Sequence, residues 1–319
     1  FVMPMLHASE PAHARDCVLD RTGNGNGNGT ANAESDSGRD FDNDPDSDTL
    51  ACGRDAQATW ENATAIGVSA AATHTDTTAI GGYATASNQQ ATAVGHSATA
   101  SGLRSTAIGY SAGALNSVAI AIGYNSSARA DRAIAIGSAA QVTGENAIAL
   151  GVQTNASQKS AIAIGNTVIS TGENAIGLGF QANAAAKDAI AIGSLTNATN
   201  ASAIAVGAMA DAAGNKAIAL GSNANASHAQ AIALGDRAKA TADDAIALGR
   251  EATVNSNDSI AIGAVASASS YEATAIGHSA SVAGQGGVAL GSLANSVGSE
   301  AIAIGYSAQA TQTDALALG

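Results

Sequence analysis

The residues of this sequence that could do chemistry are few and scattered. Its six histidines are His7, His13, His74, His96, His228 and His278. An active site needs acids, bases or nucleophiles that converge in one pocket, yet His96 and His278, which each follow a glycine, are 182 residues apart (278 − 96). A G-x-S-x-G nucleophile motif and a glycine-rich phosphate loop are also missing from the strand–helix contexts that they need. We therefore predict no enzyme activity and no catalytic or cofactor-binding residue.

A run of alternating aspartates, "DFDNDPDSD" from Asp40 to Asp48, is the one stretch that resembles a metal site. Calcium loops place oxygen ligands at every second position. This run lacks the glycine and the closing bidentate glutamate of such loops, and Pro45 interrupts it. A calcium site and a solvated acidic linker are both open readings; we favour the linker and predict no metal site.

The composition limits the partners of the chain. The formal net charge is −13, which disfavours nucleic acid and anionic lipid surfaces. No run of about 18 apolar residues occurs, so we expect no membrane contact by this chain. Charged residues are only 12% and aromatic residues 3% of the sequence, which is unlike an ordinary globular protein.

Residues 1–50 differ from the rest and are expected to be disordered or loosely packed. They contain ten acidic residues and three arginines, a net charge of −7 (3 − 10), and the run "GNGNGNG". Ala12-His13-Ala14 resembles a signal-peptidase site, although an ordinary disordered terminus is the alternative. Because the chain begins at Phe1 and ends on a repeat glycine, we expect it to be a fragment.

Residues 51–319 are one internal repeat. A glycine recurs every 14 residues from Gly53 to Gly319 without insertion or deletion, which gives 20 glycines and 19 intervals. The inner members of this series are predicted to be structural turn glycines: Gly67, Gly81, Gly95, Gly109, Gly123, Gly137, Gly151, Gly165, Gly179, Gly193, Gly207, Gly221, Gly235, Gly249, Gly263, Gly277, Gly291 and Gly305.

Apolar residues alternate in size before each glycine, as in "NAIALG" from Asn146 to Gly151. Alternation with a period of two predicts a short strand, and alanines three and five residues after the glycine predict a second one. Of the 26 charged residues after residue 50, 17 lie five or six residues before a glycine, where a solvated corner would be. A coiled coil is the main alternative, but its apolar residues would be spaced by three and four.

The sequence therefore predicts an all-β fold: a parallel β-solenoid of 14-residue coils with two short strands in each coil. Coils stacked ~4.8 Å apart would form a rod of ~90 Å. We expect Ile and Leu of the first strand to fill the coil against the alanines of the second strand. The alanines of the first strand should then face outward, where an apolar face promotes self-association. The residues expected at the subunit interface are Ala121, Ala135, Ala149, Ala163 and Ala191. The opposite assignment, with alanine inside, stays open.

The repeat resembles the head repeats of trimeric autotransporter adhesins, the YadA-like family of Gram-negative surface proteins. The family motif is close to N-S-V-A-I-G-x-x-S on a 14-residue step, and "NSVAIAIG" from Asn116 to Gly123 begins with the same five residues. The resemblance covers residues 51–319. It implies a left-handed parallel β-roll, a homotrimer, secretion to the cell surface, and binding of host extracellular matrix or host cells. The neck, stalk and C-terminal membrane anchor of the family are not in this sequence, so we expect the head alone, held in the outer membrane through regions that this fragment lacks.

Four exposed aromatic residues in one column of the repeat are candidates for contact with a ligand: Tyr110, Tyr124, Phe180 and Tyr306. Tyr110 and Tyr124 lie in adjacent coils, so their rings should stack. A column of threonines (Thr64, Thr78, Thr92 and Thr106) offers ice binding as another class of function, but isoleucine shares this column and favours partial burial.

The two cysteines, Cys17 and Cys52, offer a possible disulfide that would attach the acidic segment to the first coil, where Cys52 should be buried. From all of these features we predict a surface adhesin head that acts by binding. The alternative is a passive spacer that extends another binding domain.

Overall fold

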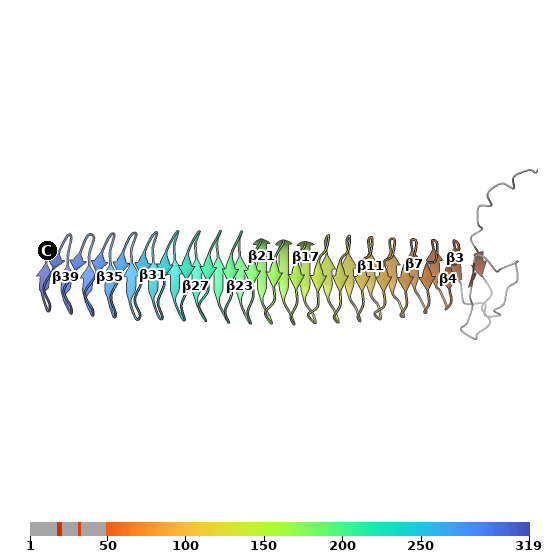
Figure 1. Cartoon of the computed structure of the whole chain (residues 1–319), viewed down its shortest axis with the longest axis horizontal. Helices are drawn as coiled ribbons and strands as arrows, with labels where there is room; N and C mark the ends of the chain where they lie inside the picture. The colour runs from red at the N-terminus through yellow and green to blue at the C-terminus, as the bar shows by residue number, and fades with distance from the viewer. Residues whose placement is uncertain (1–17, 21–30, 33–48) are drawn as a thin grey trace, which may run out of the picture. The chain divides into compact units, whose positions relative to one another are not determined.

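The computed structural model describes residues 18–20, 31–32 and 49–319 of the chain. It divides into two compact units, Phe1–Ser127 and Ala128–Gly319, and each is treated separately below. The described residues form strands and turns throughout (Figure 1). None of them belongs to a helix that could cross a membrane.

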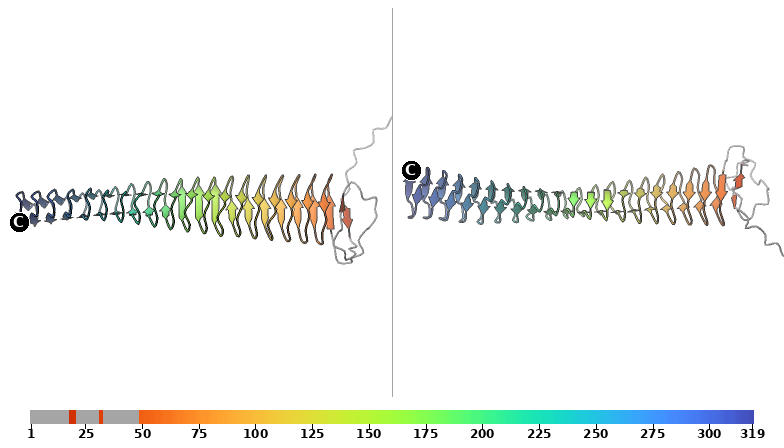
Figure 2. Two further views of the ribbon diagram at one scale, coloured as in Figure 1. Left: turned by 60° about the horizontal axis from the view of Figure 1, so that its bottom comes forward. Right: turned by 90° about the horizontal axis from the view of Figure 1, so that it is seen from above.

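Each 14-residue repeat makes one coil of two short strands, which Figure 2 shows as two facing rows. The strand before each glycine belongs to the first sheet of its unit, and the strand four residues after the glycine belongs to the second sheet. In the N-terminal unit the first-sheet strands are β3 (Thr49–Cys52), β5 (Thr64–Ile66), β7 (Thr78–Ile80), β9 (Thr92–Val94), β11 (Thr106–Ile108) and β13 (Ile120–Ile122). Those of the second sheet are β4 (Gln57–Ala58), β6 (Ala71–Ala72), β8 (Thr85–Ala86), β10 (Thr99–Ala100), β12 (Gly113–Ala114) and, at the boundary, β14 (Ser127–Ala128).

The C-terminal unit repeats this pattern. Its first-sheet strands are β15 (Ile134–Ile136), β17 (Ile148–Val152), β19 (Ile162–Asn166), β21 (Ile176–Phe180), β23 (Ile190–Ile192), β25 (Ile204–Val206), β27 (Ile218–Leu220), β29 (Ile232–Leu234), β31 (Ile246–Leu248), β33 (Ile260–Ile262), β35 (Thr274–Ile276), β37 (Val288–Leu290), β39 (Ile302–Ile304) and β41 (Leu316–Leu318). Its second-sheet strands are β16 (Gln141–Val142), β18 (Asn155–Ala156), β20 (Ile169–Ser170), β22 (Asn183–Ala184), β24 (Asn197–Ala198), β26 (Asp211–Ala212), β28 (Asn225–Ala226), β30 (Lys239–Ala240), β32 (Thr253–Val254), β34 (Ser267–Ala268), β36 (Ser281–Val282), β38 (Asn295–Ser296) and β40 (Gln309–Ala310).

Strands of successive coils pair in parallel with a register of one repeat. In the N-terminal unit Thr78 is opposite Thr92, and in the C-terminal unit Ile232 is opposite Ile246. Like residues therefore stack into columns along each sheet. This confirms the predicted parallel β-solenoid with two strands in each 14-residue coil.

The corner at each repeat glycine requires glycine for two reasons, as Gly235 shows. Its φ of +132° lies in a region that side chains rarely adopt. A Cβ there would also lie 2.5 Å from the carbonyl oxygen of Gly249, one coil further on. The amide of Gly249 in turn donates to the carbonyl of Leu234 at 2.8 Å. Backbone hydrogen bonds thus continue around the corners, and the glycines from Gly67 to Gly305 all hold a positive φ.

Alanine, and not isoleucine or leucine, fills the interior of the coil. The alanines two residues before each glycine, and those three and five after it, are buried within a single chain, except Ala317 in the last coil. The largest fully buried side chains among the described residues are valines, such as Val168 and Val254. Two strands that belong to one 14-residue coil lie too close together for Ile between them, because sheets that enclose large side chains pack ~10 Å apart.

The prediction that the alanines of the first strand face outward is therefore wrong, whereas the predicted inward position of the second-strand alanines is confirmed. The five residues expected at the subunit interface have 0% exposure and point into their own coil: Ala121, Ala135, Ala149, Ala163 and Ala191. The large apolar residues on either side of them face outward instead, as Leu150 does beside Ala149, with 42% exposure.

The volumes of side chains that face one another inside the coil are matched at two sites. Gly177 replaces the usual alanine of its column, and a Cβ there would lie 2.7 Å from Val168 Cγ1 and 2.7 Å from Ser170 Oγ. Val168 itself replaces the usual alanine three residues after a glycine. Gly287 compensates for Val282 in the same way, with a Cβ-to-Cγ1 distance of 2.9 Å. A larger side chain thus faces a smaller one at these two sites, whereas Val142 and Val254 are buried with Ala147 and Ser259 at the position of Gly287.

Two short strands cover the outer edge of the first coil. β1 (Val18–Asp20) pairs antiparallel with β3, and β2 (Ala31–Asn32) pairs antiparallel with β4. Both lie in the segment expected to be disordered or loosely packed, so this part of the segment does pair with the solenoid. A covered edge offers no free backbone groups for pairing with another chain. The rest of the segment lies outside the described residues, including the aspartate run, His7, His13 and the signal-peptidase-like motif.

Cys52 is disulfide-bonded, and its side chain is half-buried rather than buried as expected, because it occupies an outward-facing column. The predicted partner, Cys17, lies outside the described residues. In the antiparallel register Val18↔Ala51 the next positions along the two strands are 17 and 52, which supports this pairing as a prediction.

The matched interior volumes predict a double-mutant effect. Gly177→Ala should destabilise its coil by about 1–3 kcal/mol because the new methyl group overlaps Val168. Adding Val168→Ala should recover part of this loss, because it removes one of the two overlaps and leaves the one with Ser170 Oγ. Hydrogen exchange of β19 to β21, followed by mass spectrometry, measures the local stability. Additive effects of the two substitutions would contradict the matching.

The Cys17–Cys52 disulfide predicts that the unreduced, unfolded chain has no reactive thiol and that the reduced chain has two. The bond closes a loop of about 35 residues and should stabilise the cap by about 3–4 kcal/mol. Thiol titration checks the bond. Hydrogen exchange should show faster exchange in β3 and β4 after reduction and unchanged exchange in β11, which serves as the internal control.

Candidate functional site

The two outward faces of each coil have opposite character. In the first sheet, positions one and three residues before each glycine hold Ile, Leu, Val or Thr, except for Cys52 in the first coil. In the second sheet, the outward position four residues after the glycine is polar in almost every coil of the C-terminal unit. The polar residues there are Gln141, Asn155, Asn183, Asn197, Asp211, Asn225, Lys239, Thr253, Ser267, Ser281, Asn295 and Gln309. Ile169 is the exception. One face therefore favours burial against another apolar surface, and the other favours water or a polar ligand.

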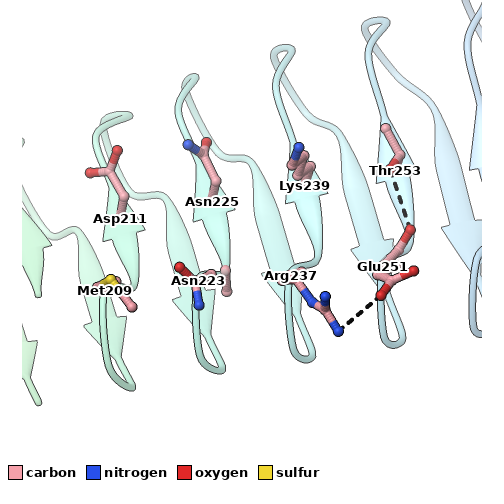
Figure 3. A pocket seen from close by; sticks show the side chains of 9 residues that line it. Met209, Asp211, Asn223, Asn225, Arg237, Lys239, Glu251 and Thr253 are labelled. Atoms are coloured by element: carbon pink, nitrogen blue, oxygen red, sulfur yellow. Dashed lines mark hydrogen bonds and ion pairs between the residues drawn. The ribbon is translucent and has the colours of Figure 1, made fainter.

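A groove of about 640 Å³ runs along the second sheet of the C-terminal unit. Figure 3 shows that two parallel rows of side chains line it, one from strands β26 to β32 and one from the turns that precede them. The strand row holds Asp211, Asn225, Lys239 and Thr253, and the turn row holds Met209, Asn223, Arg237 and Glu251. Ala224 forms part of the lining between the two rows. The groove thus combines one apolar side chain with donors, acceptors and charges of both signs.

The charges in the groove differ in how they are paired. Arg237 is held by Asp236 at 3.0 Å and by Glu251 at 3.0 Å. Within the described part of the chain, neither Asp211 nor Lys239 makes an ion pair. The negative side chain of Asp211 and the positive side chain of Lys239 are therefore available to a ligand, two coils apart in the same column.

Asp211 is positioned by a ladder of side-chain amides. Asn183 Nδ2 donates to Asn197 Oδ1 at 3.0 Å, and Asn197 Nδ2 donates to Asp211 Oδ1 at 3.0 Å. The ladder ends there because an ionised carboxylate has no hydrogen to donate to the next residue. The next member of the column, Asn225, has a buried Oδ1 without a hydrogen-bond partner. The carboxylate of Asp211 is thus oriented on one side and open on the other.

A second feature, in the N-terminal unit, is a ladder of exposed aromatic rings. His96 and Tyr110 stack with ring centroids 5.3 Å apart, and Tyr110 and Tyr124 stack at 5.4 Å. Tyr83 meets His96 edge-on at 5.6 Å. The faces of the inner rings are covered by one another, so the ladder presents mainly ring edges and hydroxyl groups.

The structure brings together only some of the four predicted ligand-facing residues. The predicted stacking of Tyr110 on Tyr124 is confirmed, and these rings are about half exposed. Phe180 and Tyr306 are exposed in other coils of the C-terminal unit, nine repeats apart, and do not join a ladder. His96 was not among the predicted ligand-facing residues, although it shares their column, and the groove was not predicted either.

Shifted pKa values and metal-binding groups do not mark a further site among the described residues. The Glu272 carboxylate, by its charge and a hydrogen bond, raises the pKa of the Tyr271 hydroxyl, and the charge of Asp258 adds to the effect. Among the described residues, no group of three or more His, Cys, Asp or Glu side chains could hold a metal ion.

The fold and its two faces define a class: a solenoid repeat protein with an apolar face and a polar face. Comparison with family models identifies the repeat. The YadA head domain repeat matches residues 61–84, 86–112, 116–140, 143–167, 170–196, 198–224, 212–238, 240–266, 268–294 and 296–319. These matches cover most of the chain, which therefore belongs to the family of YadA-like head domains. Head domains of this family are found in cell-surface autotransporter adhesins.

Comparison with solved structures finds the collagen-binding domain of the Yersinia adhesin YadA. The two chains are 21% identical, the match covers 56% of this chain and 68% of that one, and the TM-score is 0.26. A comparison with curated proteins finds no match.

Proposed function

We propose that this chain is the head of a cell-surface adhesin that assembles as a homotrimer and binds host extracellular matrix. The observation that supports this most is the division of each coil into an apolar and a polar face. The chain acts by binding, without an active site. Regions of the protein beyond this sequence would anchor it in the outer membrane.

The apolar face supports the trimer. In the C-terminal unit a row of leucines stands outward from successive first-sheet strands, and Leu248 is 39% exposed. A contiguous apolar surface of this kind is rarely left in water. A solenoid with a single flat apolar face can bury it against two further copies around a central axis, and membership of the YadA-like family agrees with this arrangement.

The polar face supports contact with a ligand. It lies on the opposite sheet from the apolar face, so a trimer would present three copies of it outward. Weak contacts that repeat along the head and among three chains add up through avidity. The related YadA domain is described as collagen-binding, and we propose a fibrous matrix protein of that kind as the partner here.

The assignment of faces predicts that charged substitutions on the apolar face dissociate the trimer and that those on the polar face do not. Replacing Leu220, Leu234 and Leu248 by Glu should leave the coils folded but dissociate the trimer, because charges would face an apolar interface. Light scattering measures the mass and circular dichroism the fold. Ser267, Ser281 and Asn295 replaced by Glu form the matched control and should leave the trimer intact.

One buried substitution completes this test. Ala247→Glu places a charge inside the coil and should unfold the coils around it. A folded, dissociated Ala247→Glu protein would show that the faces are assigned wrongly.

Matrix binding predicts saturable binding of the trimer to collagen, fibronectin or laminin in a surface-plasmon-resonance screen. The monomeric Leu220, Leu234 and Leu248 variant should bind at least tenfold more weakly, since it loses avidity. If the trimer binds none of these proteins, the passive-spacer function is favoured instead.

A further inference from the structure

We propose that the groove of the C-terminal unit binds an extended peptide segment in the polyproline II conformation that carries a basic and an acidic side chain three residues apart. The proposal rests on the proposed function, because the peptide is taken to be part of the matrix partner. It names the site and the charge pattern that the site reads. The basic side chain pairs with Asp211 and the acidic one with Lys239.

Charge complementarity supports two anchor points. Asp211 and Lys239 have no ion-pair partner among the described residues, and both line the groove. Asp211 is already oriented by the amide of Asn197. Arg237 adds no net positive charge at the Lys239 end, because ion pairs with Asp236 and Glu251 neutralise it and hold it in place. A ligand of one sign would satisfy one end and be repelled by the other.

The spacing of the anchors selects the backbone conformation. Asp211 and Lys239 are two coils apart in one column, which is ~9.6 Å at ~4.8 Å per coil. One turn of polyproline II spans three residues and ~9.3 Å, and it returns the side chain to the same side. In a β-strand, residues three apart point to opposite sides. Residues two and four apart share a side but span ~6.7 and ~13 Å.

The two rows are too close together for a ligand chain to enter between them. They are carried by residues two apart in the same coil, such as Arg237 and Lys239, and two residues of chain span at most ~7 Å. A helix with its side chains is ~10 Å or more across, and an extended chain with side chains on both sides is similarly wide. The ligand therefore lies over the rows, and the spacing of its charges selects its conformation.

Met209 gives the acidic end an apolar surface. It lies in the same coil as Asp211, is 49% exposed, and holds a left-handed backbone conformation with φ of 55°. Residues at the same corner of other coils, such as Leu195 and Val265, share this conformation, so it belongs to the repeat rather than to the site. Its thioether can pack against the methylene groups of a ligand's lysine or arginine while the charged end reaches Asp211.

The first experiment varies the peptide. Fluorescently labelled proline-rich peptides would carry one Lys and one Glu at spacings of three, two or four residues, with identical composition. Fluorescence anisotropy with the full chain should show tightest binding at a spacing of three, by about fivefold or more, since the other spacings engage one anchor at a time. Equal binding at all spacings, or no binding of the three-residue peptide at millimolar protein, would overturn the proposal.

The second experiment varies the protein. Asp211→Asn keeps the hydrogen bond from Asn197, and Lys239→Gln keeps most of the side-chain volume, so both variants should fold. Each should weaken the three-residue peptide about fivefold and should remove the preference for that spacing. Asp188→Asn is the matched control, because Asp188 accepts a hydrogen bond from Asn174 at 3.0 Å outside the groove. Lys187→Gln controls for the loss of a positive charge.

The two proposals fail in different ways. If the trimer binds a matrix protein but Asp211→Asn and Lys239→Gln leave both matrix and peptide binding unchanged, the groove proposal is wrong and the adhesin function stands. If the trimer binds no matrix protein while the peptide result holds, the site is real and the matrix assignment is wrong. Tighter binding of a helical peptide with charges seven residues apart would also overturn the polyproline assignment.

Discussion

The narrow interior of a 14-residue coil is the constraint on which the rest of this structure depends. Two strands and two tight corners must close within one repeat, so the sheets approach until only alanine, serine and an occasional threonine or valine fit between them. The same closeness explains why a Cβ on Gly235 would meet the backbone of the next coil, and why Gly177 accompanies Val168. Interior positions such as Gly177 and Val168 are therefore coupled, and a side chain at a corner glycine would strain the backbone.

A direct consequence is that large apolar side chains have no place inside and must face outward. The first sheet of each unit presents Ile and Leu, while the second presents mainly amides, hydroxyls and charges. A fold that lacks room for its own aliphatic residues needs a partner to cover them. Under the proposed function, assembly falls on the first of these faces and ligand contact on the second.

Departures from the repeat consensus are where specific recognition can arise. Successive coils pair in register, so residues 14 apart become neighbours. A residue that departs from the consensus therefore contacts the residues at the same position in the coils before and after it. Asn183, Asn197 and Asp211 form a ladder in this way, and so do His96, Tyr110 and Tyr124. The uniform interior supplies a rigid framework on which such columns add up to a groove or a ladder.

The sequence alone was sufficient for the period, the two strands per coil, the corners, the family resemblance and the stacking of Tyr110 on Tyr124. Periodicity of two shows that a strand has two faces, but it does not show which face is inside, because both orientations have the same period. The cross-section of the closed coil decides that alanine is buried. Only the tertiary structure shows the antiparallel cap formed by β1 and β2, since that pairing reverses the direction of the repeat. It alone shows the groove as well, because Asp211 and Lys239 become parts of one site only when the coils stack.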